Sequence, residues 1–218
     1  GREGLSTRAT DRLGIARNSA RALLQIANDV LDLSGIEAGR VRIERVAFDL
    51  RDLVAGVVGN FETAAHDKGL QIEADIARNV AGWVEGDPLR VRQILVNLVN
   101  NSLKFTSQGG VTLAVSVEGE DTVFLVKDTG IGVPADKREH IFERFAQADD
   151  AHSRHFGGAG LGLAIARLLA RAMGGDLGLA DSGPGGSTFR LRLPLPRSTD
   201  QGTVEVTALT QRRRFDLG

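Results

Sequence analysis

Glycine clusters organise the second half of the chain. Of the 27 glycines in 218 residues, twelve fall between positions 130 and 186, and nine of these are grouped at 130 and 132, at 157–162 and at 183–186. Because glycine has no Cβ, it allows positive φ angles and close approach of the backbone to another group. Three such clusters divide this stretch into short elements and indicate loops around a ligand.

Across residues 40–196, the spacing of apolar residues switches between the helical period and the strand period. Helical spacing predicts a helix that Asp49 caps and Gly69 ends, a second that opens at Asp87 and Pro88, and a third over about 161–173. Alternating apolar residues predict strands at 41–48, 70–76, 83–84, 111–117, 123–127, 177–180 and 188–193. This order predicts an α+β fold, a two-layer α/β sandwich with a mixed sheet and helices on one face.

A long amphipathic segment precedes this domain. From residue 10 to 34, apolar positions follow 3,4 heptad spacing and form one stripe. A helix of this length, roughly 38 Å, needs a partner for its apolar face. We therefore expect residues 1–39 to form part of a dimerisation bundle, with a surface helix on the following domain as the alternative. The polar residues 197–218 indicate a linker or tail.

The composition argues against several classes of function. Without cysteine there is no disulfide framework, zinc knuckle or thiol nucleophile. A net charge of −1 does not support general attraction to nucleic acid or to an anionic membrane. The longest apolar runs are far shorter than the ~20 residues of a membrane helix. We expect no nucleic-acid or membrane contact and a cytoplasmic location, even if a longer parent protein is membrane-anchored.

The helix after Asp87 carries an unusual density of amides. Asn97, Asn101 and Lys104 are spaced four and three residues apart and share one face. Amide oxygens suit Mg²⁺ and a lysine suits a phosphate, so this face can present oxygen ligands and an ammonium to a common ligand. A solvated helix face is the plainer interpretation.

Two loop motifs point to the same kind of ligand. Asp128 ends an apolar strand just before Gly130 and Gly132. An ionised carboxylate accepts hydrogen bonds but cannot donate them, so Asp128 suits an exocyclic amine better than a phosphate. At 157–162, glycines open a helix whose backbone N–H groups and dipole favour an anion. Neither a P-loop nor a dinucleotide motif is present. Taken alone, the Asp128 motif is also compatible with a plain turn.

In this order the segments resemble the sensor histidine kinase family, including its hybrid members, within the superfamily that also holds gyrase, heat-shock chaperone and mismatch-repair ATPases. The matching boxes are the N box at 87–106, the first glycine box at 128–132, the F box at 142–149, the second glycine box at 157–163 and the last at 185–189. The run 28–39 looks like the end of the second helix of the family's dimerisation hairpin. Five ordered boxes make the resemblance far more specific than one box would.

The resemblance implies an ATP site with roles for individual residues. It implies that Asn101 coordinates Mg²⁺, that Asn97 and Lys104 approach the phosphates, and that Asp128 binds the adenine amino group. Residues 133–158 would form a mobile lid. The nucleotide-binding set is then Asn97, Asn101, Lys104, Asp128, Gly130, Gly132, Phe145, Gly158, Gly160, Leu161, Gly162 and Thr188, with Asn97, Lys104 and Arg154 in catalysis.

The residue at position 97 separates two activities within this superfamily. Its ATP-hydrolysing members carry a glutamate four residues before the metal-binding asparagine, where this chain has Asn97. An amide has no useful basicity as a general base. We therefore expect transfer of the ATP γ-phosphoryl group to a histidine, for relay to the aspartate of a response-regulator receiver domain, rather than efficient ATP hydrolysis.

The phosphate-accepting histidine of the family is missing from this sequence. That histidine lies on the first hairpin helix before an acidic residue, a context lacking at His66, His140, His152 and His155. We expect a truncated kinase, with a degenerate family member as the alternative. The truncated kinase would bind ATP and Mg²⁺, form a homodimer through its N-terminal helix in the full protein, and be unable to autophosphorylate alone. The alternatives are a regulatory or dimerisation module that binds nucleotide without phosphotransfer, and a superfamily ATPase.

Overall fold

The computed structural model describes residues 42–146 and 160–200, together with positions 20, 23–24, 27–28, 30–31 and 33–36. The elements in chain order are β1 (Val46–Asp49), α2 (Leu50–Asp67), β2 (Gln71–Ile76), β3 (Trp83–Gly86), α3 (Pro88–Phe105), β4 (Gly110–Glu118), β5 (Asp121–Asp128), the 3-10 helix η1 (Ala135–Lys137), α5 (Gly162–Ala172), β6 (Asp176–Gly183) and β7 (Gly186–Leu193). They confirm the predicted order of helices and strands, although the first strand begins only at Val46.

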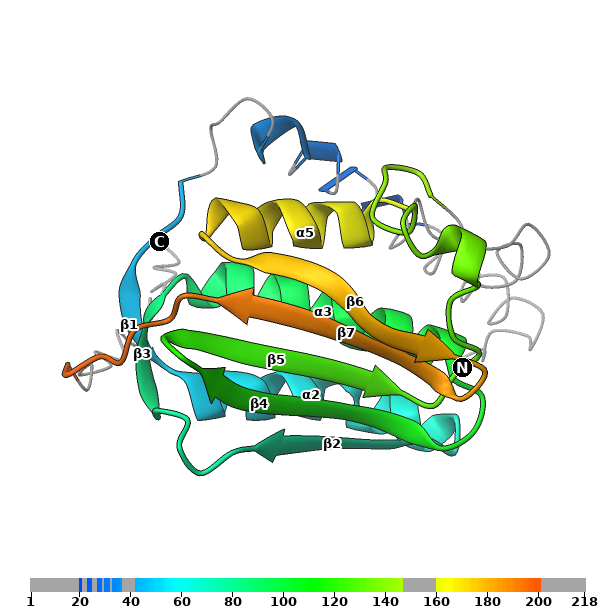
Figure 1. Ribbon diagram of the computed structural model, residues 1–218, viewed down its shortest axis with the longest axis horizontal. Helices are drawn as coiled ribbons and strands as arrows, with labels where there is room; N and C mark the ends of the chain where they lie inside the picture. Colours follow the sequence, from blue (N-terminus) through cyan, green and yellow to red (C-terminus); the bar gives the residue numbers. More distant parts are fainter. Residues whose placement is uncertain are drawn as a thin grey trace, which may run out of the picture.

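The main sheet is mixed, as the sequence predicts. Its five strands lie in the order β2-β4-β5-β7-β6, with β2 parallel to β4 and the other pairs antiparallel. β1 and β3 form a separate two-stranded antiparallel sheet. The helices α2, α3 and α5 cover one face of the main sheet, which gives the expected two-layer α/β sandwich (Figure 1).

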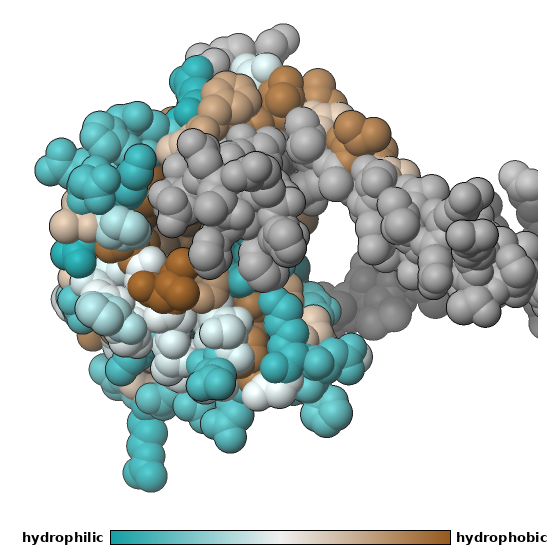
Figure 2. Space-filling model, turned by 90° about the vertical axis from the view of Figure 1, so that its right-hand side faces the viewer, coloured by the Kyte–Doolittle hydropathy of each residue, from teal (hydrophilic) through white to brown (hydrophobic). Residues whose placement is uncertain are grey.

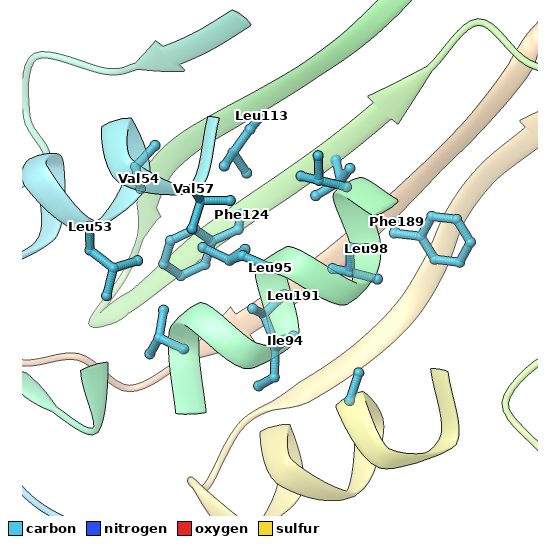
Figure 3. Packing of buried hydrophobic residues seen from close by; sticks show 14 of the residues in the cluster. Leu53, Val54, Val57, Ile94, Leu95, Leu98, Leu113, Phe124, Phe189 and Leu191 are labelled. Atoms are coloured by element: carbon cyan, nitrogen blue, oxygen red, sulfur yellow. The ribbon is translucent and has the colours of Figure 1, made fainter. Parts of the chain in front are cut away.

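The core lies between the three helices and the sheet. Leu95 and Leu98 of α3 and Phe124 of β5 are fully buried and point toward one another (Figure 3). Their burial follows from the helical period of α3 and the two-residue period of β5, which place these apolar side chains on the facing surfaces. The same packing fixes α3 across the middle of the sheet, with its last turn near the end of β5.

Side-chain caps set where the first two domain helices begin. The Asp49 side chain accepts hydrogen bonds from the backbone N–H groups of Arg51 and Asp52 at the start of α2. Asp87 caps α3 by accepting from Arg90 N–H, and Pro88 occupies the first turn. Both caps confirm the helix starts predicted from the sequence.

The described positions between 20 and 36 are helical, in agreement with the end of the predicted N-terminal helix. The remainder of that predicted helix lies outside the described residues. Leu33 is buried in the domain core, whereas Leu23, Leu24 and Leu31 are exposed. Among the described helices, none is long and apolar enough to cross a membrane.

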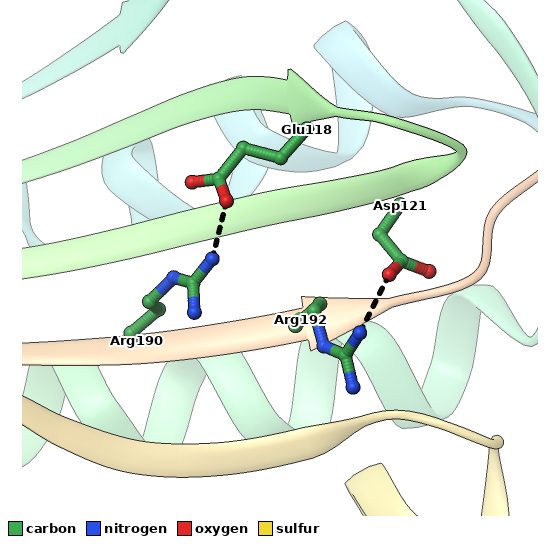
Figure 4. A network of polar contacts seen from close by, with 4 residues as sticks. All are labelled: Glu118, Asp121, Arg190 and Arg192. Carbon is green, nitrogen blue, oxygen red and sulfur yellow. Dashed lines mark hydrogen bonds and ion pairs between the residues drawn. The ribbon is translucent and has the colours of Figure 1, made fainter.

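The other face of the sheet is polar. Here Arg190 and Arg192 of β7 form ion pairs with Glu118 of β4 and Asp121 of β5 (Figure 4). All four side chains are at least one quarter exposed to solvent, so each pair contributes about 0–1 kcal/mol. This face is therefore solvated, and the buried polar groups that suggest chemistry lie on the helix side.

Candidate functional site

The ends of several elements meet at one end of the sheet. β5 ends at Asp128, β7 begins at Gly186, α3 ends at Phe105 and α5 begins at Gly162. This end faces the viewer in Figure 2, where a hydrophobic patch interrupts a largely hydrophilic surface. The sequence-predicted site residues on α3, after β5 and at the start of α5 therefore come together here.

Asp128 is the buried polar centre of this end. It is 5% exposed, and its Oδ1 accepts hydrogen bonds from Gly130 N–H at 2.9 Å and Ser187 N–H at 3.1 Å. Its Oδ2 accepts from the Ser102 hydroxyl at 3.2 Å. Donors on α3, after β5 and on β7 thus fix the carboxylate in one orientation, which a buried charge requires.

The turn after β5 requires glycine for packing reasons. A Cβ at Gly130 would lie 2.5 Å from the carbonyl oxygen of Phe105, and one at Gly132, where φ is 73°, would lie 2.0 Å from that of Gly183. The turn therefore packs its backbone directly against α3 and against the β6–β7 connection. Because Gly130 and Gly132 have no side chains, the turn that borders the site can pack this closely.

The amide face of α3 lies against the start of α5. Asn101 donates a hydrogen bond from Nδ2 to Asn97 Oδ1 at 2.9 Å. A Cβ at Gly162 would lie only 2.5 Å from the Asn97 amide nitrogen, so glycine is what lets α5 approach this pair. Lys104 lies one turn further along α3, and partial burial lowers the pKa of its ammonium.

The start of α5 is also held from the F-box side. Phe145, with φ of 61°, donates its backbone N–H to the carbonyl oxygen of Gly160 at 3.0 Å. Gly160 has φ of 67°, and Leu161 is buried next to it. Among the described residues no side chain caps α5, and backbone N–H groups at such a helix start can bind an anion.

Aromatic and cationic contacts attach the F-box segment to the domain. The ring of Phe142 meets Phe189 of β7 edge-on, with centroids 6.4 Å apart. The guanidinium of Arg167, on α5, lies over the Phe142 ring, 4.8 Å from the ring centre. The same guanidinium forms an ion pair with Asp176 at 3.5 Å. Phe142 is therefore fixed to α5 and the sheet, close to the element ends that build the site.

The structure does not bring Thr188 to this cluster. Thr188 pairs with Lys127 in the β5–β7 ladder and lies on the open face, because side chains alternate along a strand. Its neighbour Ser187 faces the helices and contacts Asp128. Two other predicted residues, Arg154 and Gly158, lie outside the described residues.

Ser102 and Ser187 were missed by the sequence predictions. Ser102 falls four residues after Leu98, within the apolar stripe of α3. A small polar residue inside an apolar stripe is a usable signal of a buried hydrogen bond. Ser187 lies beside Thr188 in the last glycine box, and it contacts Asp128 through its backbone N–H, which no side-chain pattern in the sequence reveals.

A large cavity lies at the opposite end of the sheet. It has a volume of about 750 Å³ and is bordered by Glu44, Gly86, Glu120, Met173 and Arg197, among others. None of the residues that the sequence assigns to chemistry borders it. Cavity size is therefore a poor guide here, and the buried polar centre at Asp128 marks the candidate site.

The comparisons with known proteins identify the fold and the domain. Residues 86–197, just over half of the chain, match the family described as histidine kinase-, DNA gyrase B- and HSP90-like ATPase. The chain belongs to this ATPase family. The match begins just before α3 and ends after β7, so it contains the Asn97–Asn101 pair, Asp128 and the start of α5.

Individual relatives within this ATPase family are sensor kinases. The chain is 43% identical to the sensory/regulatory protein RpfC of Xanthomonas campestris pv. campestris, over 84% of this chain and 26% of that protein. It is 42% identical to the sensor histidine kinase GacS of Pseudomonas protegens, over 90% of this chain and 22% of that protein. The chain thus spans about a quarter of the length of these curated relatives.

A solved structure agrees with these relatives. Full-length ShkA in complex with AMPPNP superposes with a TM-score of 0.78 at 34% identity, over 89% of this chain and 40% of that one. Together with the family match, this likeness identifies the chain as an ATP-binding catalytic domain of the histidine kinase type. The recognition made from the five sequence boxes is confirmed.

Proposed function

We propose that this chain binds Mg-ATP at the Asp128 end of the sheet and, as part of a sensor histidine kinase, transfers the γ-phosphoryl group to a histidine on a helical hairpin of the parent protein. The observation that carries the proposal is the buried, acceptor-only carboxylate of Asp128, which lies at the same end of the sheet as the amide pair of α3 and the uncapped start of α5. One site can therefore bind both the base and the phosphates of a nucleotide.

The phosphates of the nucleotide fit the groups on α3 and α5. Backbone N–H groups at the start of α5 and the Lys104 ammonium can both bind negatively charged phosphate oxygens. Gly160 and Gly162 let the start of α5 pack directly against the backbone of Phe145 and the side chain of Asn97. We assign Asn97, Lys104, Gly160, Leu161 and Gly162 to phosphate binding.

The residues present also fit a magnesium ion that arrives with the nucleotide. Asn101 uses its Nδ2 on Asn97, which leaves its Oδ1 available as an oxygen ligand. In phosphate sites Mg²⁺ takes one or two protein oxygens and completes its shell with phosphate oxygens and water. Among the described residues there is no cluster of three or more acidic or histidine side chains that would hold a metal without the nucleotide. When bound, the ion neutralises charge on the phosphates.

Phosphotransfer is favoured over hydrolysis by the residue at position 97. A water nucleophile requires a base, and the Asn97 side chain is an amide whose oxygen already accepts from Asn101. An imidazole nucleophile carries its own lone pair and needs only alignment and charge neutralisation. The acceptor chemistry that best fits this site is therefore a histidine.

The acceptor would be supplied by the helical part of the parent kinase, and the phosphoryl group would pass on to a receiver domain. Leu23, Leu24 and Leu31 leave an apolar surface on the described part of the N-terminal helix, which supports a homodimeric bundle there. RpfC and GacS are named as sensory proteins, which supports the same role for the parent of this chain. We place this domain in the cytoplasm, where ATP is available.

The test is transfer of label in a reconstituted reaction. The 218-residue chain is mixed with Mg²⁺, γ-radiolabelled ATP and the helical hairpin of the parent protein that carries the acceptor histidine. Acid-labile label on the hairpin supports the kinase. Nucleotide binding without label supports a regulatory module instead, and release of free phosphate without label supports an ATPase.

Two matched variants each replace one asparagine by alanine, on different helices. Asn101→Ala should lose Mg-ATP binding and label transfer, because it removes the proposed metal ligand. Asn60→Ala, at an exposed position on α2, should behave as the wild type. Unchanged Mg-ATP affinity in Asn101→Ala would overturn the metal assignment.

A further inference from the structure

The hydrogen bonds that Asp128 accepts from the described residues leave one acceptor position open. An ionised carboxylate has about four lone-pair sites. Two on Oδ1 are used by Gly130 N–H and Ser187 N–H, and one on Oδ2 is used by the Ser102 hydroxyl. The open position therefore lies on Oδ2, the oxygen that Ser102 contacts.

Ser102 is placed to control that oxygen. It is 2% exposed, lies on the buried face of α3, and approaches Asp128 from a different element than the two backbone donors. Gly130 and Ser187 hold Oδ1 with main-chain groups, which side-chain changes do not remove. Ser102 is thus the one side chain among the described residues with a hydrogen bond to this carboxylate.

We propose that Ser102 is the positioning residue for base selection in the nucleotide site, acting through Asp128. This inference rests on the proposed function. By donating to Oδ2, Ser102 holds the carboxylate in its plane and leaves an acceptor facing the base. An exocyclic amine can donate to that acceptor, whereas an exocyclic keto oxygen cannot.

The chemistry of the bases turns this geometry into selectivity. Adenine presents an N6 amine as a donor, whereas guanine presents O6 as an acceptor at the corresponding position. A keto oxygen placed against Oδ2 would leave two acceptors facing each other, both desolvated. Sites that hydrogen-bond a substrate amine reject analogues without it because their own buried groups are left unpaired.

The experiment compares purine nucleotides that differ at this group. Dissociation constants of Mg²⁺ complexes are measured by calorimetry for ATP, for purine riboside triphosphate, which lacks the amine, and for GTP. For the wild type we expect ATP to bind about tenfold or more tightly than purine riboside triphosphate, the range for a hydrogen bond to a charged group. GTP should bind more weakly still.

In Ser102→Ala the preference for the amine should shrink. We expect ATP affinity to fall by about three- to tenfold while purine riboside triphosphate changes by less than about twofold. Ser102→Thr, which keeps the hydroxyl, should restore the preference. Alanine is the best helix former, so Ser102→Ala is expected to leave α3 folded, and a thermal melt of each variant checks this.

A buried serine at the other end of the domain provides the control. Ser198 is 8% exposed and its hydroxyl contacts only Asp200 among the described residues, so Ser198→Ala should change no nucleotide affinity. Equal weakening of all three nucleotides in Ser102→Ala would overturn the inference by showing a purely structural role, as would an unchanged ATP preference. Failure of the wild type to bind any nucleotide would contradict the proposed function itself.

Discussion

Two buried aspartates lie near opposite ends of α3 and have different roles. Asp87 is 4% exposed and Asp128 is 5% exposed, and each accepts hydrogen bonds from two backbone N–H groups. Those of Asp87 come from Glu44 and Arg90, so its two oxygens fasten the entry segment and cap α3. Asp128 receives a third bond, from Ser102, and borders the glycines and amides of the site.

The comparison separates structural burial of a charge from burial for recognition. The large cavity lies near Asp87, bordered by Glu44 and Gly86, yet the residues around it serve connections between elements. At the Asp128 end the carboxylate is accompanied by the hydrogen-bonded amide pair of α3 and by the start of α5, whose N-cap residue Leu161 makes no side-chain cap. A buried carboxylate indicates a site only where such groups accompany it.

The largest expected difference comes from changing each aspartate. Asp128→Asn should lower ATP affinity about 10- to 100-fold, since a hydrogen bond to a charged acceptor contributes about 1.5–3 kcal/mol. Asp87→Ala should leave ATP affinity within about twofold and lower the free energy of unfolding by roughly 1–2 kcal/mol through loss of the α3 cap. Calorimetric titration and urea unfolding of both variants measure the two effects; a reversed pattern would show that the roles are exchanged.

A smaller effect is expected from adding one methyl group at each of two helical glycines. Gly162→Ala places a Cβ 2.5 Å from the Asn97 amide nitrogen, so the amide must move and ATP affinity should fall about three- to tenfold. Gly59→Ala in α2 meets no atom within 4 Å. That variant should gain about 0.5–1 kcal/mol of stability from helix propensity and keep its affinity. Wild-type affinity in Gly162→Ala would argue against the role of Asn97.

Two arginines on α5 sharpen the contrast further. Both pair with Asp176, but only Arg167 also lies over the Phe142 ring. Arg167→Gln should lower the free energy of unfolding by about 0.5–1 kcal/mol, the range of a partly exposed cation–π contact. Arg171→Gln should cost at most about 0.5 kcal/mol, since it removes an exposed ion pair. Equal losses in chemical denaturation would show that the contact with Phe142 contributes nothing.

The smallest expected effect is electrostatic and lies on the F-box segment. The hydrogen bond that His140 donates to the Glu143 carboxylate, followed by the charge of that carboxylate, raises the pKa of His140 above its usual 6.5. Because the folded-state pKa is the higher one, the pair stabilises the fold fully below pH 6.5 and loses that contribution as the pH rises through the raised value. An NMR titration of His140 should give a midpoint above 6.5, and Glu143→Gln should lower it.

Most of the fold was predictable from the sequence because its signals are local. Asp49, Asp87 and Pro88 set helix starts, and the change of hydrophobic period located the strands. The first strand was extended too far at its start, since the segment before Val46 has alternating residues but no strand partner among the described residues. The order of elements also predicted a mixed sheet with helices on one face, which the structure confirms, whereas the order of strands within the sheet was not predicted.

The candidate site was only partly predictable. Asn97 and Asn101 share a face because four residues make about one helical turn, and the structure places them in hydrogen-bond contact. The prediction named Thr188, but Ser187 lies in the same sequence box, and the box does not say which one faces the helices. Strand pairing makes that choice, since a shift by one residue exchanges the two faces.

By itself the sequence determined the helices and strands, the glycine-rich loops, and the role of Asp128 as a hydrogen-bond acceptor. The tertiary structure alone decided which donors from distant parts of the chain hold that carboxylate. Ser102 lies 26 residues and Ser187 59 residues away along the chain. Helix and strand periods arise from short-range backbone geometry, whereas such contacts depend on sheet register and on how α3 packs across the sheet, which no local pattern encodes.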